Sequence, residues 1–411
     1  LSFGAAMLMK FSLILLIPAY AIMIIGFVAS QTELSVKRRL SKAAELSVRA
    51  LMAGAIGIAL IWIVNAYAVW NYPPDREFRD ARVVLSSFPM PQFVSADLWL
   101  IQHRLTRPLG QYFWGLLMVF QRTGGGNTQY FLGEITSEGS PLYFPLLYLL
   151  KETFAFHILT FLAIIFAVAG VARAGGKSAE KTIAWIRGHF IEFSSLSFIA
   201  LYWLISIRSN LNIGVRHVLP TFPFIYLLVA KGISGWLRPK EGLESGGWLN
   251  WLKKTYRFYI VYAPKFTAVM LLLGWIAISS LAAFPNYLSY FNFLGKGIDN
   301  GYKIATDSNY DWGQDLKRLA SFAEDNGIEK IAVDYFGGGN PAYYLGDKFE
   351  PWWSSRGQYH GWFAVSANAQ MGAYGRIGPG FSRKAEDSYE WLKPFRPVAR
   401  AGKSIFIYRL P

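Results

Sequence analysis

Six long apolar segments run through this 411-residue sequence, and their length constrains the fold more than any motif does. A helix needs about 20 apolar residues to cross the hydrocarbon core of a bilayer. The segments lie at residues 11–29, 48–70, 141–171, 189–207, 216–235 and 259–284. We therefore expect a multi-pass membrane protein, built as an all-α helical bundle of about six spans in contact with the lipid bilayer.

Lysine and arginine gather in every second loop between these segments. The basic residues follow the first, third and fifth expected spans: Lys37, Arg38, Arg39, Lys42 and Arg49; Arg173, Lys177, Lys181 and Arg187; and Arg238, Lys240, Lys253, Lys254 and Arg257. Cytoplasmic loops of membrane proteins carry such an excess of basic residues. The pattern predicts that these loops are cytoplasmic, and that residues 71–140, residues 208–215 and everything after Phe284 lie on the other side.

Composition narrows the function classes. The net charge is +15, and 53% of the residues are hydrophobic. In a membrane protein this basic excess is accounted for by cytoplasmic loops that face anionic lipid, so we expect no nucleic-acid partner. The absence of cysteine excludes disulfides, thiol catalysis and Cys-ligated zinc. The five histidines have no i, i+4 pairing, which argues against a zinc site.

The hydropathy pattern changes after Phe284, and we expect two domains: a transmembrane bundle at residues 1–285 and a small extracytoplasmic α/β domain at residues 286–411. Helical and strand-like segments alternate in the second part. Helices are expected at about 313–325, at PAYYLG and near EDSYEWL, and strands at IEKIAVDYF, at GWFAVSA and in the last stretch ending KSIFIYRL. Trp352, Trp353 and Trp362 in this domain either stack on sugar rings or form its core.

The long loop at residues 71–140 is expected to contribute an amphipathic helix at the membrane interface, within ADLWLIQHRLTRPLGQYFWGLLMVFQR. Such a loop either packs over the bundle or forms a partial lid over an outward-facing cavity. Glu134 and Glu138 follow this helix. Each is either a solvated surface acid or a group that contacts a substrate.

Basic residues also stand at the expected outer ends of spans. Lys10 follows the small residues of GAAMLM at a predicted turn, where it either snorkels to lipid headgroups or points into a polar cavity. Arg208, Arg216 and His217 lie close together in IRSNLNIGVRHVLPTFP, beside the helix-breaking Pro220 and Pro223. Two arginines at this depth can anchor the chain to lipid phosphates or grip a substrate phosphate bidentately, and the broken helix favours the second interpretation.

Four polar residues alternate in DSNYDWGQDLKRL: Asp307, Asn309, Asp311 and Asp315. A D-x-N-x-D run is how a calcium loop presents its oxygen ligands. The EF-hand pattern would have glycine at Trp312 and glutamate at Arg318, so calcium is the weaker interpretation. We expect Asp311 or Asp315 to complement the N-terminal dipole of the following helix, and we expect no metal or other cofactor.

Four segments together resemble a known family. GAAMLMKFSLILLIP, GEITSEGSPLYFPLLYLLKE, NIGVRHVLPTFPF and DSNYDWGQDLKRL resemble, in that order, segments of bacterial membrane glycosyltransferases of the protein-O-mannosyltransferase-like type, in the GT-C superfamily (glycosyltransferase family 39 type). The resemblance implies an enzyme of the bacterial cytoplasmic (inner) membrane. Its donor would be a polyprenyl-phosphate sugar, and its acceptor a hydroxyl of a protein, lipid or glycan on the extracytoplasmic side.

The resemblance also implies roles for particular residues. Lys10, Arg216 and His217 stand in segments whose basic residues hold the lipid phosphate in that family. The family's catalytic acid lies in the first extracytoplasmic loop. Because the sequence opens in what reads as the middle of a membrane segment, we expect this acid upstream of Leu1, in a longer chain. Lys10, Arg208 and Arg216 would then stabilise the departing polyprenyl phosphate.

Two other classes stay open. A membrane transporter or flippase for a lipid-linked substrate would also have interfacial arginines and broken helices. It would need neither a large external loop nor a C-terminal α/β domain. A non-catalytic relative that binds envelope glycan would lack the upstream acid.

Overall fold

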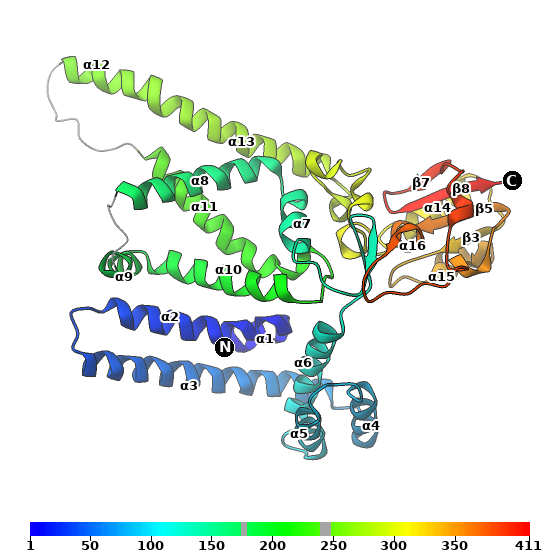
Figure 1. Cartoon of the computed structure of the whole chain (residues 1–411), viewed down its shortest axis with the longest axis horizontal. Coiled ribbons are helices and arrows are strands. Elements are labelled where there is room, and N and C mark those ends of the chain that lie inside the picture. Colours follow the sequence, from blue (N-terminus) through cyan, green and yellow to red (C-terminus); the bar gives the residue numbers. More distant parts are fainter. Residues whose placement is uncertain (174–178, 239–247) are drawn as a thin grey trace. The chain divides into compact units, whose positions relative to one another are not determined.

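The computed structural model describes residues 1–173, 179–238 and 248–411 (Figure 1). These residues form two compact units. The first holds Leu1–Gly126 and Ala174–Leu211, and the second holds Asn127–Arg173 and Asn212–Pro411. The boundary expected at residue 285 therefore falls inside the second unit, which contains both apolar helices and the C-terminal sheet.

The first unit is helical. Its described helices are α1 (Ser2–Met9), α2 (Leu16–Ser30), α3 (Val36–Ala68), α4 (Pro74–Val84), α5 (Pro91–Gln102), α6 (Arg107–Gly125), α9 (Ala179–Gly188) and α10 (Phe190–Arg208). Helix α2 packs between α3 and α10, and α1 packs on α3. A Cβ atom on Gly4 would lie only 2.7 Å from the Cα atom of Gly57, so glycine at these two positions allows α1 and α3 to cross closely.

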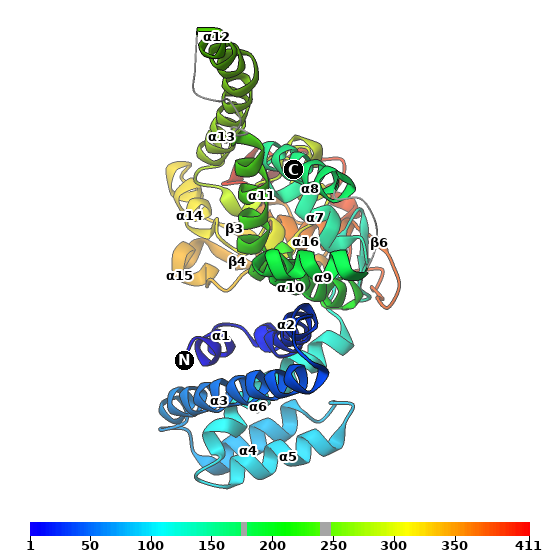
Figure 2. The same cartoon turned by 90° about the vertical axis from the view of Figure 1, so that its left-hand side faces the viewer.

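Two helices, α5 and α6, replace the single amphipathic helix expected at residues 96–122, and α4 precedes them. Helices α4, α5 and α6 pack together, as Figure 2 shows. Each begins with proline in its first turn, at Pro74, Pro91 and Pro108. Proline suits the first turn of a helix but breaks a helix interior. Pro108 therefore starts a new helix where the apolar pattern alone reads as continuous.

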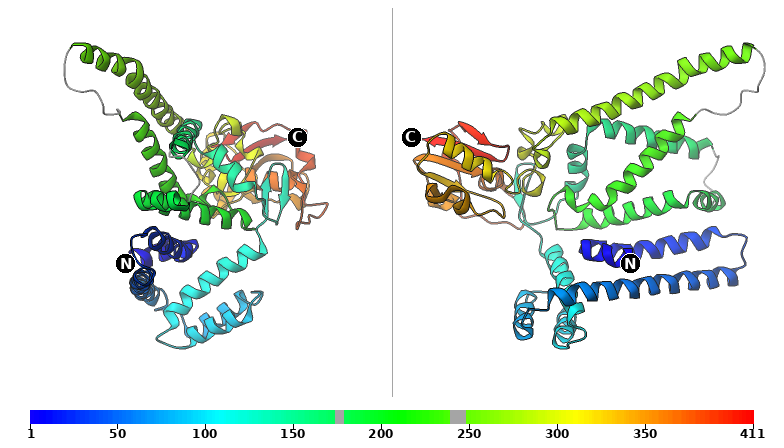
Figure 3. Two further views of the ribbon diagram at one scale, coloured as in Figure 1. Left: turned by 60° about the vertical axis from the view of Figure 1, so that its left-hand side comes forward. Right: turned by 180° about the vertical axis from the view of Figure 1, so that it is seen from behind.

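Three of the second unit's described long helices form an apolar cluster. The described helices of this unit that precede its C-terminal part are α7 (Tyr143–Lys151), α8 (Phe154–Arg173), α11 (Phe222–Leu237), α12 (Trp248–Tyr256) and α13 (Ala263–Ala282). Buried residues of α8, α11 and α13 pack together, among them Phe156, Val229 and Val269. Helix α12 continues through a π-helical turn at Arg257–Tyr262 into α13, which gives the long helix seen in Figure 3.

The C-terminal part of the second unit is an α/β fold, as expected. Its sheet has the order β4-β3-β5-β8-β7, from strands β3 (Ile331–Asp334), β4 (Phe349–Pro351), β5 (Gly361–Ser366), β7 (Ala399–Ala401) and β8 (Ile405–Leu410). Strand β3 runs parallel to β4 and β5, whereas β8 is antiparallel to β5 and β7. Helices α14 (Leu316–Asp325), α15 (Pro341–Leu345) and α16 (Ala367–Tyr374) accompany this sheet. Leu316 and Leu319 of α14 pack on Ile331 in the main apolar core.

A smaller sheet joins residues far apart in the second unit. Strands β1 (Gln129–Phe131) and β2 (Glu134–Thr136) form a hairpin, and β2 also pairs in parallel with β6 (Arg376–Ile377). The helix expected near EDSYEWL is wrong, since only a 3-10 turn forms at Glu390–Leu392, just before Pro394. Helix α16, which the sequence did not predict, begins instead where the Ser366 side chain caps the Ala369 amide.

The expectation of six spans is wrong. Within the described residues, four helices are long and apolar enough to cross a membrane, or five if α7 and α8 form one broken span. These two helices are bent by 112° relative to each other. Helix α11 has 16 residues, about 24 Å at helical rise, because the chain at Val215–Thr221 forms two 3-10 turns ahead of Pro223.

The basic residues expected in loops mostly lie in helices. Lys37, Arg38, Arg39, Lys42 and Arg49 belong to α3, which begins at Val36 because Ser35 caps it. Lys181 and Arg187 belong to α9. Lys177 and Lys240 lie outside the described residues.

Candidate functional site

Three of the four family-like segments meet at Asn309, whose side chain is fully buried. Its Oδ1 atom accepts a hydrogen bond from the Val215 amide at 3.0 Å. Its Nδ2 group donates to the Tyr143 hydroxyl oxygen at 2.8 Å. The Lys151 ammonium donates to the Asn309 carbonyl oxygen, and also to that of Leu288 at 2.7 Å. We call this meeting point, formed by Tyr143, Lys151, Val215 and Asn309, the Asn309 junction.

The chain before Arg216 is held against the residue that precedes Asn309. Gly214 has φ +107°, and a Cβ atom there would lie 2.2 Å from the Ser308 Oγ atom. The same Oγ donates a hydrogen bond to the Ile213 carbonyl oxygen at 2.5 Å. Only glycine fits both the backbone conformation and the space. The turn that carries Arg216 is therefore held by contacts to two successive residues, Ser308 and Asn309.

Arg216 is exposed and lies over the ring of Trp312, with 4.4 Å between its Cζ atom and the ring centroid. Its Nε group donates to the Ile213 carbonyl oxygen at 3.2 Å. The neighbouring His217 ring stacks on Phe144, with centroids 5.4 Å apart. The Arg216 guanidinium and the His217 imidazole thus project from one short 3-10 turn, Val215–His217. Each packs against an aromatic ring from another segment, Trp312 for Arg216 and Phe144 for His217.

The four basic residues predicted to bind phosphate divide between the two units. In the first unit, the backbone of Lys10 is extended between α1 and the 3-10 helix Phe11–Leu15. The chain therefore leaves the helix at Lys10, where the sequence predicted a turn. Arg208 is the last residue of α10 and is exposed. Arg216 and His217 belong to the second unit and stand beside each other. A single phosphate site made by all four remains a prediction.

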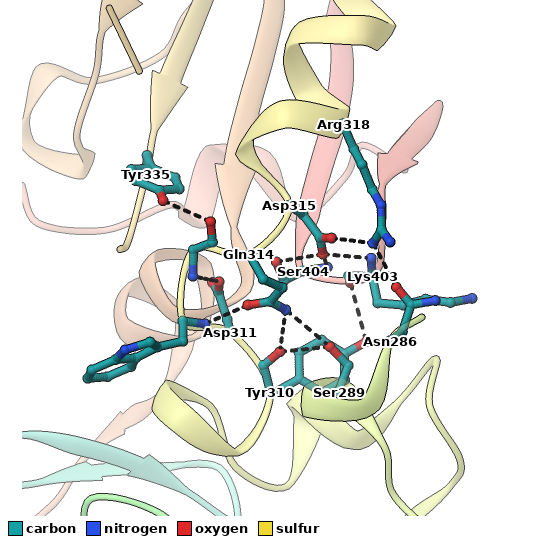
Figure 4. Close-up of polar contacts among 12 residues, drawn as sticks. Asn286, Ser289, Tyr310, Asp311, Gln314, Asp315, Arg318, Tyr335, Lys403 and Ser404 are labelled. Atoms are coloured by element: carbon teal, nitrogen blue, oxygen red, sulfur yellow. Dashed lines mark hydrogen bonds and ion pairs between the residues drawn. The ribbon is translucent and has the colours of Figure 1, made fainter. Parts of the chain in front are cut away.

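Asp311 and Asp315 are fully buried beyond the Asn309 junction, in the network that Figure 4 shows. The Asp311 carboxylate accepts hydrogen bonds from the backbone amides of Gly313 at 3.1 Å and Asn368 at 3.2 Å. Burial raises the pKa of Asp311 to about 7, although these two bonds favour the charged form. The carboxylate therefore sits close to its protonation point at neutral pH.

Asp315 joins helix α14 to the β7–β8 turn. Its Oδ2 atom accepts hydrogen bonds from the Lys403 amide, the Ser404 amide and the Ser404 hydroxyl, at 2.9 to 3.0 Å. Its Oδ1 atom pairs with Arg318 at 2.5 Å. Asp315 occupies the N-cap position of α14, yet its side chain caps no amide of that helix. The backbone amides that donate to it belong to the turn opposite instead, and the expected complement to the helix dipole stays a prediction.

The residues of the possible calcium loop have different partners. Asn309 serves the junction, and Asp311 binds two backbone amides. Asp307, at φ +54°, accepts a hydrogen bond from the Ser308 amide through Oδ1. In the described part of the chain, no group of three or more histidine, cysteine or acidic side chains is placed to hold a metal ion.

Glu134 lies on β2 and forms an ion pair with Arg376 on β6. Both side chains are exposed. The pair links the small sheet across 242 residues of sequence. Its contacts are those of a surface acid, one of the two interpretations that the sequence left open for Glu134.

Sequence reasoning missed Tyr143, Lys151 and Trp312 as members of this site. Asn309 was singled out only as a calcium ligand. The signal was present in the family-like segments, three of which supply the members of the Asn309 junction. Tyr143 and Asn309 are 166 residues apart, so no local pattern pairs them.

Comparison of the chain with models of protein families, with curated proteins and with solved structures gave no match.

Proposed function

We propose that the chain is an integral-membrane glycosyltransferase, which transfers a sugar from a polyprenyl-phosphate donor to an acceptor hydroxyl on the extracytoplasmic face of the bacterial inner membrane. Support comes from four or five apolar helices and from the Asn309 junction. The observation that carries the proposal is the rigid Val215–His217 turn, which holds Arg216 exposed beside His217.

The chemistry of this turn suits a phosphate. A guanidinium donates two parallel hydrogen bonds to phosphate oxygens, and its charge is independent of pH in the working range. A protonated imidazole adds a further donor. Lys151 contributes a third basic group at the same junction, where its hydrogen bonds go to carbonyl oxygens. A preorganised set of this kind stabilises a phosphate whose negative charge grows as it leaves.

In the reaction, a carboxylate base takes the proton of the acceptor hydroxyl. The hydroxyl oxygen forms a bond to the anomeric carbon of the sugar, and the bond from that carbon to the phosphate oxygen breaks. The electron pair of the broken bond leaves with polyprenyl phosphate. Arg216 and His217 are proposed to bind that phosphate, so they stabilise the leaving group more strongly in the transition state than in the bound donor.

The test is the Arg216→Ala variant of the full-length protein, assayed for transfer from a polyprenyl-phosphate sugar. We expect turnover to fall roughly a hundredfold or more, as for the loss of one preorganised charge contact. Arg216→Lys should recover part of the loss, because lysine keeps the charge without the planar fork. Arg396→Ala serves as the control, since Arg396 is also exposed in the second unit. Unchanged transfer in Arg216→Ala would refute the phosphate-binding role.

One observation favours a second function, a transporter or flippase for a lipid-linked substrate. Helices α7 and α8 are bent by 112° at a short break, which is the geometry of a broken span or a re-entrant loop. Broken helices form substrate sites in transporters. Reconstitution into vesicles separates the two proposals: a transporter moves a fluorescent polyprenyl-phosphate sugar between leaflets without an acceptor, whereas a transferase consumes the donor only when an acceptor is present.

A further inference from the structure

Trp312 is a large aromatic residue that stays almost half exposed, at 46%. It belongs to the most distinctive motif of the sequence, DSNYDWGQDLKRL, yet it contributes nothing to the apolar core of the α/β fold. Its ring contacts two side chains. The Arg216 guanidinium lies over it at 4.4 Å, and the Phe336 ring meets it edge-on, with centroids 5.7 Å apart.

The backbone around Trp312 is held tightly. The Trp312 amide donates to the Gln314 side chain at 2.8 Å, and the Tyr335 hydroxyl donates to the Gly313 carbonyl oxygen at 2.9 Å (Figure 4). Gly313 has φ +79°, and a Cβ atom there would lie 2.8 Å from the Cα atom of Gly337. The two loops therefore touch backbone to backbone, which only glycine permits.

These anchors all belong to the α/β fold. Tyr335 and Gly337 directly follow strand β3. Asp315, at the other end of the loop, is tied to Lys403 and Ser404 between β7 and β8. The backbone that carries Trp312 is consequently held by the C-terminal α/β fold, while Arg216 belongs to the Val215–His217 turn.

We propose that Trp312 is a positioning residue for Arg216, so that the C-terminal α/β fold completes the phosphate-binding site; this inference rests on the proposed function. A guanidinium stacked on an aromatic ring keeps its plane fixed and donates its hydrogen bonds at its edge, where a phosphate is bound bidentately. The stack holds the fork in one orientation without competing for its donors. Trp312 itself touches no phosphate in this arrangement.

The stack predicts a specific pattern of kinetic effects. A cation–π contact at an exposed site contributes enough to change binding by about fivefold. Trp312→Leu should therefore lower kcat/KM for the donor by about fivefold, and Trp312→Phe should restore most of it because the ring face is kept. In an Arg216→Ala background, Trp312→Leu should cause no further loss. A merely structural role of Trp312 would reduce activity by the same factor in both backgrounds.

The control is Tyr344, which is 38% exposed and carries the Lys317 ammonium over its ring at 5.9 Å. This pair is also an exposed cation–π contact, and it lies outside the Asn309 junction. Tyr344→Leu should leave kcat/KM unchanged. Thermal unfolding of each variant in detergent shows whether the fold is intact, and Trp312→Phe covers the case in which the leucine variant does not fold.

A binding measurement separates this inference from the proposed function. The dissociation constant for undecaprenyl phosphate is measured by calorimetry for the four proteins of the Arg216–Trp312 double-mutant cycle. Coupling between the two residues supports the inference, even if the protein transfers no sugar and the proposed function fails. Sugar transfer with fully additive effects overturns the inference alone. A wild-type protein that binds no polyprenyl phosphate overturns both.

Discussion

Two regions of the molecule each bury a pair of acids, and they differ in how many carboxylate oxygens receive a hydrogen bond. In the α/β fold, each oxygen of Asp311 and Asp315 accepts at least one hydrogen bond. In the α4–α5–α6 helices, Glu77 and Asp97 are equally inaccessible to solvent. Only one of their four oxygens is satisfied there, by an ion pair of 2.5 Å between Glu77 and Arg107.

The difference follows from where backbone amides are available. A helix uses its own N–H groups internally, so a carboxylate buried among helices must find a side-chain donor or take up a proton. Loops, strand ends and the first turn of a helix leave amides unpaired, and such amides satisfy Asp311 and Asp315 at Gly313, Asn368 and Ser404. Asp97 is therefore left without a donor, although burial raises the pKa of both Asp97 and Asp311 to about 7.

Asp97 faces few groups that stabilise a charge. Burial, and secondarily the charge of Glu77, raise the pKa of Asp97 to about 7. Glu77 lies on the neighbouring α4, and Arg107 on α6 is engaged by Glu77. The buried Trp114 Nε1 atom on α6 has no hydrogen-bond partner.

The largest effect is expected at the satisfied pair. Asp315→Asn replaces one oxygen by an amino group among donors and removes the charge that Arg318 pairs with. We expect a loss of about 4 kcal/mol in the stability of the α/β fold, from several hydrogen bonds to a charged acceptor. Chemical denaturation of the full-length protein in detergent measures it. Asp325→Asn, on the exposed face of α14, should change stability by less than about 0.5 kcal/mol.

The second largest effect on stability is expected at the buried ion pair between Glu77 and Arg107 in the α4–α5–α6 helices. Glu77→Gln leaves the mostly buried Arg107 without its counter-charge, and we expect a loss of about 3 kcal/mol. Hydrogen exchange of the amides in α4 to α6 should rise accordingly. Glu45→Gln is the control, because Glu45 forms exposed pairs with Lys42 and Arg49. Exchange that rises equally in both variants would contradict the argument from burial.

The smallest effect has the opposite sign and depends on pH. The pKa of Asp97 is about 7 in the folded protein and about 3.9 in the unfolded chain, so the folded state binds the proton more tightly. This contribution to stability is fully present below about pH 4, and it is lost as the pH rises through about 7. Asp97→Asn removes the buried charge. It should stabilise the protein by about 2 kcal/mol at pH 8 and leave stability nearly unchanged at pH 4.

Unfolding of the Asp97→Asn variant and the wild type at both pH values checks this. The same substitution at Asp311 should destabilise at both pH values, because an amide group would face the Gly313 or Asn368 N–H. If Asp97→Asn and Asp311→Asn shift stability in the same direction at pH 8, the contrast between the two regions is wrong.

Local patterns predicted much of the fold. The apolar runs at residues 11–29 and 189–207 are helices, and the strand expected at GWFAVSA and the short helix at PAYYLG form where expected. The predictions failed where a local break interrupts a continuous apolar pattern. Pro220 and Pro223 shorten the helix expected at residues 216–235, and the chain bends sharply between Lys151 and Phe154. A hydropathy average over about 20 residues does not detect such a short break in an apolar run.

The candidate site was predictable only in pieces. Arg216 and His217 stand out because they lie at the end of an apolar run beside the helix-breaking Pro220 and Pro223. Their partners Trp312 and Phe144 do not stand out, because an aromatic residue in a membrane protein is common. Asn309 stood out only as part of a possible calcium loop, because its neighbours are acidic, and its side chain instead contacts the Val215 amide and the Tyr143 hydroxyl.

The sequence by itself determined that this chain forms apolar helices and a C-terminal α/β fold, because hydrophobicity and its period act over a few residues at a time. Only the tertiary structure decided that Asn309 meets Val215, 94 residues away, and Tyr143, 166 residues away. It likewise decided that Asp311 is satisfied and Asp97 is not. Whether a buried polar group finds a partner depends on which distant backbone and side-chain donors the fold brings within about 3 Å, and no local pattern records that.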